Sequence, residues 1–364
     1  MKNQTKIALF FGGKISQHLV LIKKAAKKLG VRLDLVSYNR VCFDTTELRV
    51  KIRGNLEGRP QGTARTIKNE GWLQINDYDV LFFRTTGKHW EEVDLINYEL
   101  KITNYELKKK PIIVDPIILN GKPSMACKAY QMLALKKAGI DVPKTIYGSL
   151  WYLYETMKNS DDSRQQNFSC SRLRTNATQT RLPDGQVTAR EKFIDCESII
   201  FPVIVKGSGG DRGTRVYKAD NLEEMEELVR KLRKSETEEG KRYMLQEYIP
   251  NDGDYRVLVL GEKVLGVMKR SSQNKSEFRN NYSAGGAVEV ADLPEEIKQL
   301  AVKAARVCGL AVAGVDVAFR DFDRSKPVIW EVNKGPQFKG FMQATGIDVP
   351  KEIVLFLSSL KVES

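Results

Sequence analysis

The sequence predicts a mixed fold, with a parallel α/β domain at its N-terminal end and an α+β module after it. Strand and helix patterns alternate over residues 6–116, which is typical of a parallel sheet. After residue 200, apolar runs of strand length follow one another across short turns, as they do in antiparallel sheets. The length of 364 residues suits two or three domains of about 100–150 residues each.

The N-terminal elements come in the order strand, helix, strand. Residues 6–11 form an apolar run of strand length, and Gly12 and Gly13 supply the turn that follows it. Apolar residues recur at helical spacing over 15–29, so a helix is expected there. Further strands of the same sheet are predicted at 31–38, 78–84 and 111–116.

The rest of the chain alternates helix patterns with strand patterns around one polar segment. A helix is predicted at 125–139, where Gly139 ends it, and residues 155–198 are expected to form a long polar inserted loop. Later helices are expected at 221–234 and 294–308. The predicted division is an N-terminal α/β domain at 1–122, a central subdomain at 123–245 that holds the insertion, and a C-terminal subdomain at 246–364.

Composition and charge exclude several classes of function. Lys and Arg number 59 against 46 Asp and Glu, so the formal net charge is +13, which favours anionic partners such as nucleotides or acidic substrates. Five cysteines without metal-binding spacing indicate a reducing compartment, and two histidines make a zinc site or a Ser-His-Asp triad improbable. No apolar stretch reaches the length of a membrane span, so a cytoplasmic protein is expected.

A glycine-rich loop occupies residues 207–213, between the strand patterns FPVIVK and TRVYK. Because it joins two strands, it is predicted to be a hairpin loop, and neither a P-loop nor a dinucleotide-binding turn. Glycines allow backbone N–H groups to approach phosphate oxygens closely, and Lys206 at the strand end could add a positive charge. A glycine-rich hairpin is by itself more often only a turn.

Two later strands, AVAGVDVAFR (311–320) and PVIWEVN (327–333), are predicted to pair as an antiparallel hairpin. Pairing Asp316 with Glu331 centres the turn between Asp323 and Arg324, inside the polar segment. An apolar face is then expected at Val315, Val317, Phe319, Val328, Trp330 and Val332, with Asp316, Glu331 and Asn333 on the opposite face. Opposed carboxylates repel unless a cation neutralises them, so the trio is predicted to bind Mg²⁺ together with phosphate. The alternative is a solvent-facing polar strand face.

Basic residues form the third group with a chemical signature. It comprises Arg256, Lys269, Arg270 and Arg279, with Asn281 close in the sequence. Guanidinium groups donate two parallel hydrogen bonds to phosphate or carboxylate, so this group is expected to hold a transferring phosphoryl group. Any one of these residues could instead be an ordinary surface cation.

Together these motifs resemble the ATP-grasp superfamily, and within it the RimK-like branch of carboxylate–amine ligases. The resemblance runs from about residue 124 to residue 350 and implies an ATP-grasp fold with a parallel N-terminal α/β domain. It rests on KAYQMLALKKAGIDVPKT, FPVIVKGSGGDRGTRV, LQEYI, GDYRVLV, FRNNYSAGGA, KAARVCGLAVAGVDV and EVNKGPQFKGF, which occur in the order of the family.

The resemblance implies ATP and Mg²⁺ as cofactors, with Mn²⁺ as an alternative metal. It implies that Lys128 and Lys206 contact the phosphates, that Glu247 and Tyr248 form the adenine-binding hinge, and that Asp254 lies near the ribose. In FRNN, Arg279 and Asn281 match family residues that touch the triphosphate or the acyl-phosphate, and Asp316, Glu331 and Asn333 match the metal ligands. From the glycine-rich loop itself, Gly209, Gly210 and Gly213 are predicted to contact the nucleotide. From the basic group, Arg256 and Arg270 are predicted to be catalytic together with Arg279.

The sequence departs from the family pattern at two places. Arg215 stands where the glycine loop usually has another Gly, and Lys-Gly-Pro-Gln follows Asn333 where a small residue, Ser, Pro and Gly are common. Both departures could alter loop closure or acceptor binding. Neither removes a predicted metal ligand.

The function that these observations favour is ATP-dependent amide formation through an acyl-phosphate, with glutamate or another amino acid added to a peptide, protein or small acceptor. An ATP-grasp kinase for a small polyol, and a non-catalytic basic module that binds nucleic acid or an acidic protein, are the alternatives. Membranes and nucleic acid are not expected partners of the ligase, and a homo-oligomer is left open.

Overall fold

The structure, a computed structural model, describes residues 5–44, 49–53, 72–73, 75–86, 89–103, 110–115, 127–158, 199–208, 215–272 and 287–360. These residues form two compact units. Unit 1 comprises residues 1–142 and 251–364, and unit 2 comprises residues 143–250. The division into three domains stays a prediction, since the units are defined by compactness.

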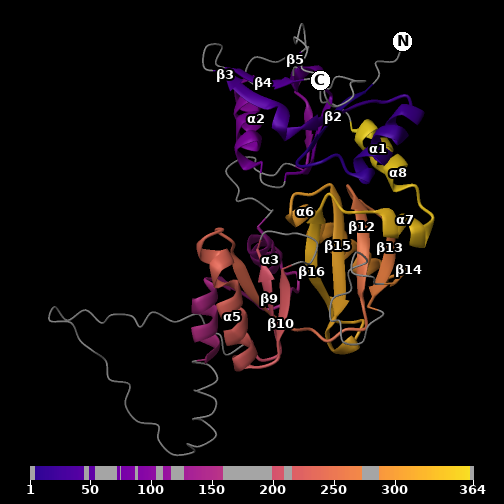
Figure 1. Ribbon diagram of the computed structural model, residues 1–364. Coiled ribbons are helices and arrows are strands. Elements are labelled where there is room, and N and C mark those ends of the chain that lie inside the picture. The colour runs from indigo at the N-terminus through magenta and orange to yellow at the C-terminus, as the bar shows by residue number, and fades with distance from the viewer. Residues whose placement is uncertain are drawn as a thin grey trace, which may run out of the picture. The chain divides into compact units, whose positions relative to one another are not determined.

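Unit 1 begins with a four-stranded parallel sheet in the order β2-β1-β6-β7 (Figure 1). Its strands are β1 (Lys6–Phe11), β2 (Arg32–Ser37), β6 (Val80–Thr85) and β7 (Ile112–Val114), and its helices are α1 (Gln17–Lys28) and α2 (Trp90–Thr103). The predicted parallel α/β arrangement is therefore confirmed. A small antiparallel sheet adds β3 (Val41–Asp44), β4 (Arg49–Arg53) and β5 (Trp72–Leu73), with short helices η1 (Tyr38–Arg40) and η2 (Ile75–Asp77).

Both faces of the parallel sheet are buried, which explains why its strands are continuous apolar runs. On one face Phe10 and Phe83 stack with ring centroids 4.8 Å apart and pack with residues of α2. On the other face lie α1 and α8 (Val349–Ser359), which are neighbours in Figure 1. That second cluster continues into Leu258 and Met268 of the next sheet, so it forms one core within unit 1.

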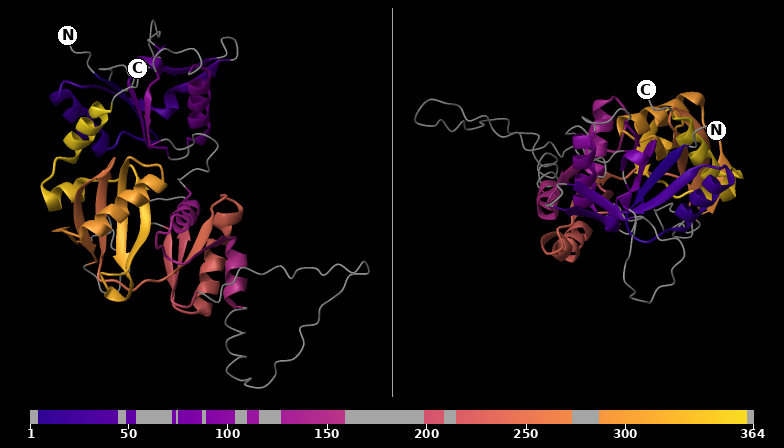
Figure 2. Two further views of the ribbon diagram at one scale, coloured as in Figure 1. Left: turned by 180° about the vertical axis from the view of Figure 1, so that it is seen from behind. Right: turned by 90° about the horizontal axis from the view of Figure 1, so that it is seen from above.

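The second large sheet of unit 1 is antiparallel, in the order β14-β13-β12-β15-β16 (Figures 1 and 2). Its strands are β12 (Asp254–Leu260), β13 (Lys263–Ser271), β14 (Ala287–Ala291), β15 (Val312–Phe319) and β16 (Pro327–Lys334). The associated helices are α3 (Lys128–Lys137), α6 (Glu295–Val307) and α7 (Lys339–Thr345), with η5 (Arg320–Phe322) in the β15–β16 turn. Helices α3 and α6 contribute to the apolar core on one face of this sheet.

Helix α6 forms where the sequence predicts it, for identifiable reasons. Ile297, Ala301 and Ala305 recur at a spacing of four, so they share one buried face. Acidic side chains in the first turn and Arg306 in the last turn complement the helix dipole. Gly309, with φ of +67°, lies just past its end in the left-handed conformation that glycine adopts readily.

The hairpin β15–β16 has the predicted register at the site and a bulge beyond it. Asp316 pairs with Glu331, as expected, but the register shifts by one residue before Val317 pairs with Ile329. Trp330 is the extra residue of this bulge, which reverses the orientation expected for the residues of β16 that precede it. The prediction that Val328 and Trp330 share the apolar face with Val332 is therefore wrong, because Ile329 packs there.

Unit 2 contains an antiparallel sheet in the order β10-β9-β11-β8. Its elements are β8 (Thr145–Gly148), a helix at 150–158, β9 (Val203–Gly207), β10 (Val216–Ala219), α5 (Leu222–Thr237) and β11 (Tyr243–Glu247). Asn221 caps α5, since its side chain accepts a hydrogen bond from the Glu224 amide at 2.9 Å. Strands β9 and β10 pair directly, so residues 208–215 join two antiparallel strands, as the hairpin prediction requires.

The polar insertion begins later in the chain than the sequence indicated. Residues 155–158 belong to the helix at 150–158, in which Leu150, Leu153 and Met157 are buried in the core of unit 2. The prediction of a loop is wrong for these four residues, because Leu153 and Met157 stand one helical turn apart and share an apolar face. Residues 159–198 lie outside the described part of the chain.

Replacing about 30 residues between Ser160 and Ser198 with a short Gly/Ser linker should preserve ATP binding, because changing the length of a surface loop costs little entropy. The measurement is nucleotide affinity by calorimetry, together with the melting temperature. Met157→Ala is the control: it should destabilise the protein by about 2–5 kcal/mol, since it empties a buried site. Global unfolding of the linker variant would show that the replaced segment belongs to the core.

Within the described residues, no helix combines the length and apolar character needed to cross a membrane.

Candidate functional site

Charged side chains gather on one face of the five-stranded sheet, opposite the face that packs against α6. Strand β12 supplies Asp254 and Arg256, β13 supplies Arg270, β15 supplies Asp316, and β16 supplies Glu331 and Asn333. Cross-strand pairing aligns Asp254 with Arg270, Arg256 with Asp316, and Asp316 with Glu331. These six residues and Lys128 are called the polar cluster below.

Asp316 lies at the centre of the polar cluster, and donors surround both of its oxygens. Arg256 binds it with two parallel hydrogen bonds, from Nε to Oδ1 at 2.7 Å and from Nη2 to Oδ2 at 2.8 Å. Oδ2 also accepts a hydrogen bond from Asn333 Nδ2 at 3.0 Å and lies 3.1 Å from Arg270 Nη2. Asp316 is only 5% exposed, so water screens these interactions weakly.

Gly314 lets Pro336 approach β15 closely. A Cβ atom at position 314 would lie 2.9 Å from the Pro336 Cβ, closer than such atoms normally come, whereas it would be in ordinary contact with the Arg256 Nε at 3.6 Å. Glycine at this position therefore allows the segment after β16 to pack against β15.

Arg270 joins two buried carboxylates. Its guanidinium group forms a close ion pair with Asp254, whose Oδ2 lies 3.0 Å from Nε, and it also reaches Asp316. Asp254 is 1% exposed and Arg270 is 5% exposed. Asp254, which resemblance places near the ribose, thus makes its observed contact with Arg270.

Burial and the ion pairs shift the acidities of this group in opposite directions. Burial alone would raise the pKa of Asp316, but Arg256 and Arg270 outweigh it and hold that pKa well below its usual range. Burial raises the pKa of Asp254, and Arg270 only partly offsets the rise. Burial opposes the charge of Arg270, but Asp316 and Asp254 raise its pKa above the usual value. The two arginines therefore favour the ionised form of Asp316, whereas burial disfavours that of Asp254.

Glu331 has a partner from outside the sheet. Lys128, the first residue of α3, places its Nζ 2.9 Å from Glu331 Oε1. Helix α3 is held against β16 by Gln131, whose Nε2 donates to the Val332 carbonyl oxygen at 3.1 Å. Sequence reasoning assigned no role to Gln131, because nothing in a helical pattern shows which neighbouring backbone a buried amide will reach.

The donor types of the polar cluster fit a hard cation. Asp316, Glu331 and Asn333 supply carboxylate and amide oxygens from adjacent strands, and Mg²⁺ in nucleotide sites uses one or two carboxylates plus phosphate. Among the described residues, no group of three or more His, Cys, Asp or Glu side chains is spaced to bind a metal by itself. A cation at this trio would therefore need ligands beyond these protein carboxylates.

Lys269 does not join the polar cluster. It pairs across the strands with Tyr255 and lies on the opposite face of the sheet, where its Nζ is 2.8 Å from Asp252 Oδ2. The sequence-based grouping of Lys269 with Arg256 and Arg270 is therefore wrong, because adjacent residues of a strand point to opposite faces.

The residues of unit 2 that resemblance assigns to ATP lie at strand ends. Lys206, near the end of β9, donates to Gln246 Oε1 of β11 at 3.3 Å. Glu247 ends β11, and its backbone N–H donates to the Lys144 carbonyl oxygen at 3.0 Å. The Lys218 ammonium group lies over the Tyr248 ring, 5.0 Å from the ring centroid, in a cation–π contact. No pattern in the sequence indicated a role for Gln246 or Lys218.

Several predicted site residues lie outside the described part of the chain. They are Gly209, Gly210, Gly213, Arg279 and Asn281.

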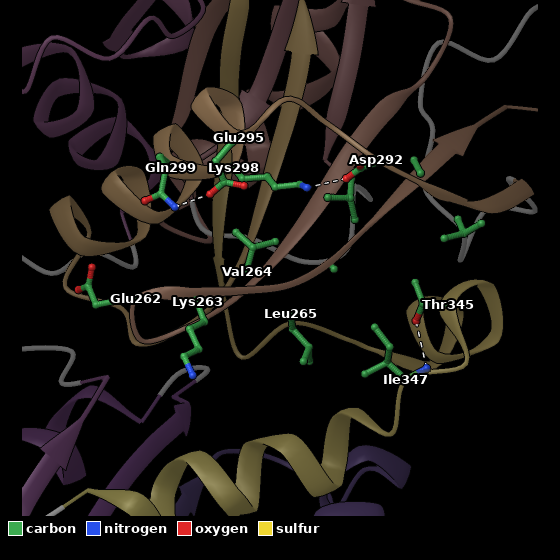
Figure 3. A pocket seen from close by; sticks show the side chains of 14 residues that line it. Glu262, Lys263, Val264, Leu265, Asp292, Glu295, Lys298, Gln299, Thr345 and Ile347 are labelled. Atoms are coloured by element: carbon green, nitrogen blue, oxygen red, sulfur yellow. Dashed lines mark hydrogen bonds and ion pairs between the residues drawn. The ribbon is translucent and has the colours of Figure 1, made fainter.

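A separate pocket of about 530 Å³ opens beside β13 and β14 (Figure 3). Its walls include Glu262 and Lys263 at the start of β13, and an ion pair of 2.6 Å joins Lys298 to Asp292 at its rim. No residue of the polar cluster lines it. The pocket is therefore not part of the candidate site.

Comparison with known proteins identifies the family. A profile described as a RimK-like ATP-grasp domain matches residues 170–357, slightly more than half of the chain. The relative named "Probable alpha-L-glutamate ligase 1" of Shewanella frigidimarina (strain NCIMB 400) is 36% identical over 160 residues, or 43% of this chain and 50% of that protein. A "Probable alpha-L-glutamate ligase" of Methanococcoides burtonii is 35% identical over 158 residues, with the same shares. The chain thus spans about half the length of the curated relatives it matches.

Solved structures agree on the fold. The structure of "ATP-grasp ligase PsnB complexed with minimal precursor" matches with a TM-score of 0.59 and 15% identity, over 97% of this chain and 99% of that chain. A RimK domain ATP-grasp protein from Sphaerobacter thermophilus DSM 20745 matches with a TM-score of 0.56, 15% identity and the same shares. At such identities the likeness shows the fold alone, and it is the ATP-grasp fold. With this fold and with the profile match across its C-terminal half, the chain belongs to the RimK-like ATP-grasp family.

Proposed function

We propose that the protein is an ATP-dependent ligase that joins a carboxylate to an amine. The observation that carries the proposal is the pairing of Asp316 with Glu331 across β15 and β16. Asn333 donates a hydrogen bond to Asp316. Three cationic side chains bind these two carboxylates: Arg256, Arg270 and Lys128. Opposed carboxylates among guanidinium groups suit the binding of a metal–phosphate complex. Family membership supports the same reading.

The proposed roles follow from the chemistry of each side chain. Asp316, Glu331 and Asn333 would hold Mg²⁺, which neutralises charge that develops on the phosphates. Arg256 and Arg270, which Asp316 holds in place, would face phosphoryl oxygens. Arg279 is proposed as the third catalytic arginine on sequence grounds. Proposed nucleotide contacts are Lys128, Lys206, Gly209, Gly210, Gly213, Glu247, Tyr248, Asp254 and Asn281.

The proposed reaction has two chemical steps. A substrate carboxylate oxygen attacks the γ-phosphorus of ATP, and the bond between that phosphorus and the oxygen shared with the β-phosphate breaks. ADP departs, and the phosphoryl group stays on the substrate as an acyl-phosphate. An uncharged amine then attacks the acyl carbon, phosphate departs, and the amine loses a proton as the amide forms. Water would hydrolyse the acyl-phosphate, so the site must exclude it. No covalent protein nucleophile is required.

The substrate class is proposed from the named relatives. Several are probable alpha-L-glutamate ligases, and one structural match is the ATP-grasp ligase PsnB complexed with a precursor peptide. Glutamate or a similar amino acid, joined to a peptide, protein or small acceptor, is therefore the proposed chemistry. The formal net charge of +13 agrees with acidic substrates. We also place the protein in the cytoplasm, because its cysteine pattern suits a reducing compartment.

Hydroxylamine tests the proposal directly. When ATP, Mg²⁺ and the correct carboxylate are supplied, hydroxylamine should capture the acyl-phosphate as a hydroxamate, because it replaces the amine as nucleophile. The assay uses pools of amino acids and peptides, with mass spectrometry of the products and measurement of ADP. A stable phosphate ester without hydroxamate would indicate a polyol kinase. Salt-sensitive binding to nucleic acid without ATP consumption would indicate a basic binding module.

A further inference from the structure

The backbone segment that follows Asn333 is held by the parallel sheet of unit 1. Arg84, near the end of β6, donates from Nη2 to the Pro336 carbonyl oxygen at 2.7 Å. Lys334 donates from Nζ to the Asp115 carbonyl oxygen. The exit of β16, next to a proposed metal ligand, is therefore anchored by two contacts from a different sheet.

The entry of the partner strand β15 is anchored by the same sheet. Asp115 Oδ1 accepts hydrogen bonds from the backbone N–H groups of Ala311 at 2.5 Å and Val312 at 3.2 Å. Val312 opens the strand that carries Asp316. Asp115 thus touches both strands of the hairpin at the end where the proposed metal ligands lie, through its side chain to β15 and its carbonyl to β16.

These anchors are retained at a local cost in stability. Asp115 has φ of +53°, in the left-handed region, where a residue with a side chain is disfavoured by about 1–2 kcal/mol. Arg84 and Asp115 are 2% and 1% exposed, and neither Arg84 Nη1 nor Asp115 Oδ2 has a hydrogen-bond partner within the described part of the chain. Strain and unsatisfied buried groups concentrate where function requires a fixed geometry.

The anchored segment approaches β6 so closely that it requires glycine. Gly335 has φ of +58°, and a Cβ atom there would lie 2.5 Å from the Arg84 carbonyl oxygen. Lys334 and Gly335 are also residues at which the sequence departs from the common family pattern. The departure is explained by this anchoring, since Lys334 reaches Asp115 and Gly335 permits the contact with β6.

We propose that Arg84 and Asp115 are positioning residues of the ligase site, which fix both strands of the β15–β16 hairpin so that Asp316, Glu331 and Asn333 keep their relative places. The inference rests on the proposed function. It assigns the N-terminal sheet a part in catalysis through the backbone of the hairpin. A displacement of about 1 Å at a catalytic group can cost on the order of a hundredfold in rate, so loss of an anchor should reduce kcat.

The test compares Arg84→Met, Arg84→Lys and Asp115→Ala with Phe83→Leu in the full-length protein. Asp115→Ala removes the oxygen that accepts from the Ala311 and Val312 amides. Phe83 neighbours Arg84 on β6 but packs on the other face of the sheet, so its variant weakens the same strand and leaves the anchors intact. We expect kcat to fall at least about tenfold in Arg84→Met and Asp115→Ala, with KM for ATP changed less than about threefold. Arg84→Lys, which keeps a donor, should recover part of the loss.

Hydrogen exchange of the backbone amides at 311–316 and 331–336 supplies a readout that does not depend on activity. Exchange should be at least about tenfold faster in Arg84→Met and Asp115→Ala, and close to wild type in Phe83→Leu. Unchanged exchange in both anchor variants, or an equal loss of kcat in Phe83→Leu at matched melting temperature, would overturn the inference. Absence of hydroxamate formation in the wild type would instead overturn the proposed function.

Discussion

Asp316→Asn and Glu331→Gln should each lose at least about a hundredfold in turnover, because each removes a negative charge from the proposed metal site while nearly conserving side-chain volume. Their effects on stability should differ. Asp316 is 5% exposed and bound by two arginines, so its loss leaves buried cations uncompensated, at a cost of about 3–5 kcal/mol. Glu331→Gln should destabilise the protein much less, because 20% of the Glu331 side chain is exposed.

Glu331→Gln is therefore the cleaner test of the metal assignment. Turnover and the half-saturating Mg²⁺ concentration are measured together, after folding is checked by calorimetry. Asp321→Asn, the same kind of change on the exposed turn of the same hairpin, should leave both unchanged. Near-normal turnover of Glu331→Gln at ordinary Mg²⁺ would refute the assignment.

The central part of the site could be predicted from sequence because strand pairing follows simple geometry. Two alternating strands joined by a short polar turn admit few registers, and the one that aligns Asp316 with Glu331 is the one observed. The bulge at Trp330 could not be predicted in the same way. It adds one residue to one strand, and the packing of Ile329 into the core decides its position.

Contacts between distant segments were beyond the reach of sequence patterns. Arg84, Asp115 and Lys334 come from three separate strand ends, and no local periodicity links them. The parallel sheet itself was predictable, since its strands are continuous apolar runs. The contacts of the side chains at the carboxyl ends of these strands were not predictable, because they depend on how the second sheet of unit 1 packs.

Asp254 has a partner that resemblance did not indicate. Its place near the ribose stays a proposal, and its carboxylate is buried against Arg270. Alternation along β12 explains the contact, because Asp254 and Arg256 share the face of the polar cluster. The cross-strand partner of Asp254 is Arg270, and such pairs interact most strongly when both are buried.

Arg270→Met should therefore destabilise the protein by about 3–5 kcal/mol at pH 7, as much as Asp316→Asn. It leaves the Asp254 carboxyl 1% exposed without its guanidinium partner, while Asp316 retains Arg256 and Asn333. Chemical denaturation measures the effect. Arg306→Met removes an ion pair that is largely exposed, with Glu262, and should change stability little.

The pH dependence of stability and a double mutant test whether the unpaired Asp254 carboxyl causes the destabilisation of Arg270→Met. Without Arg270, the pKa of Asp254 should rise further above its usual value, since burial is then less opposed. A carboxyl whose folded pKa is raised contributes stability at low pH and loses it as pH rises through that pKa. The deficit of Arg270→Met relative to wild type should thus be largest at pH 7 and shrink toward pH 4. Adding Asp254→Asn should recover most of the loss at pH 7 and remove the pH dependence. Additive losses in the double mutant would show that the two side chains are not energetically coupled.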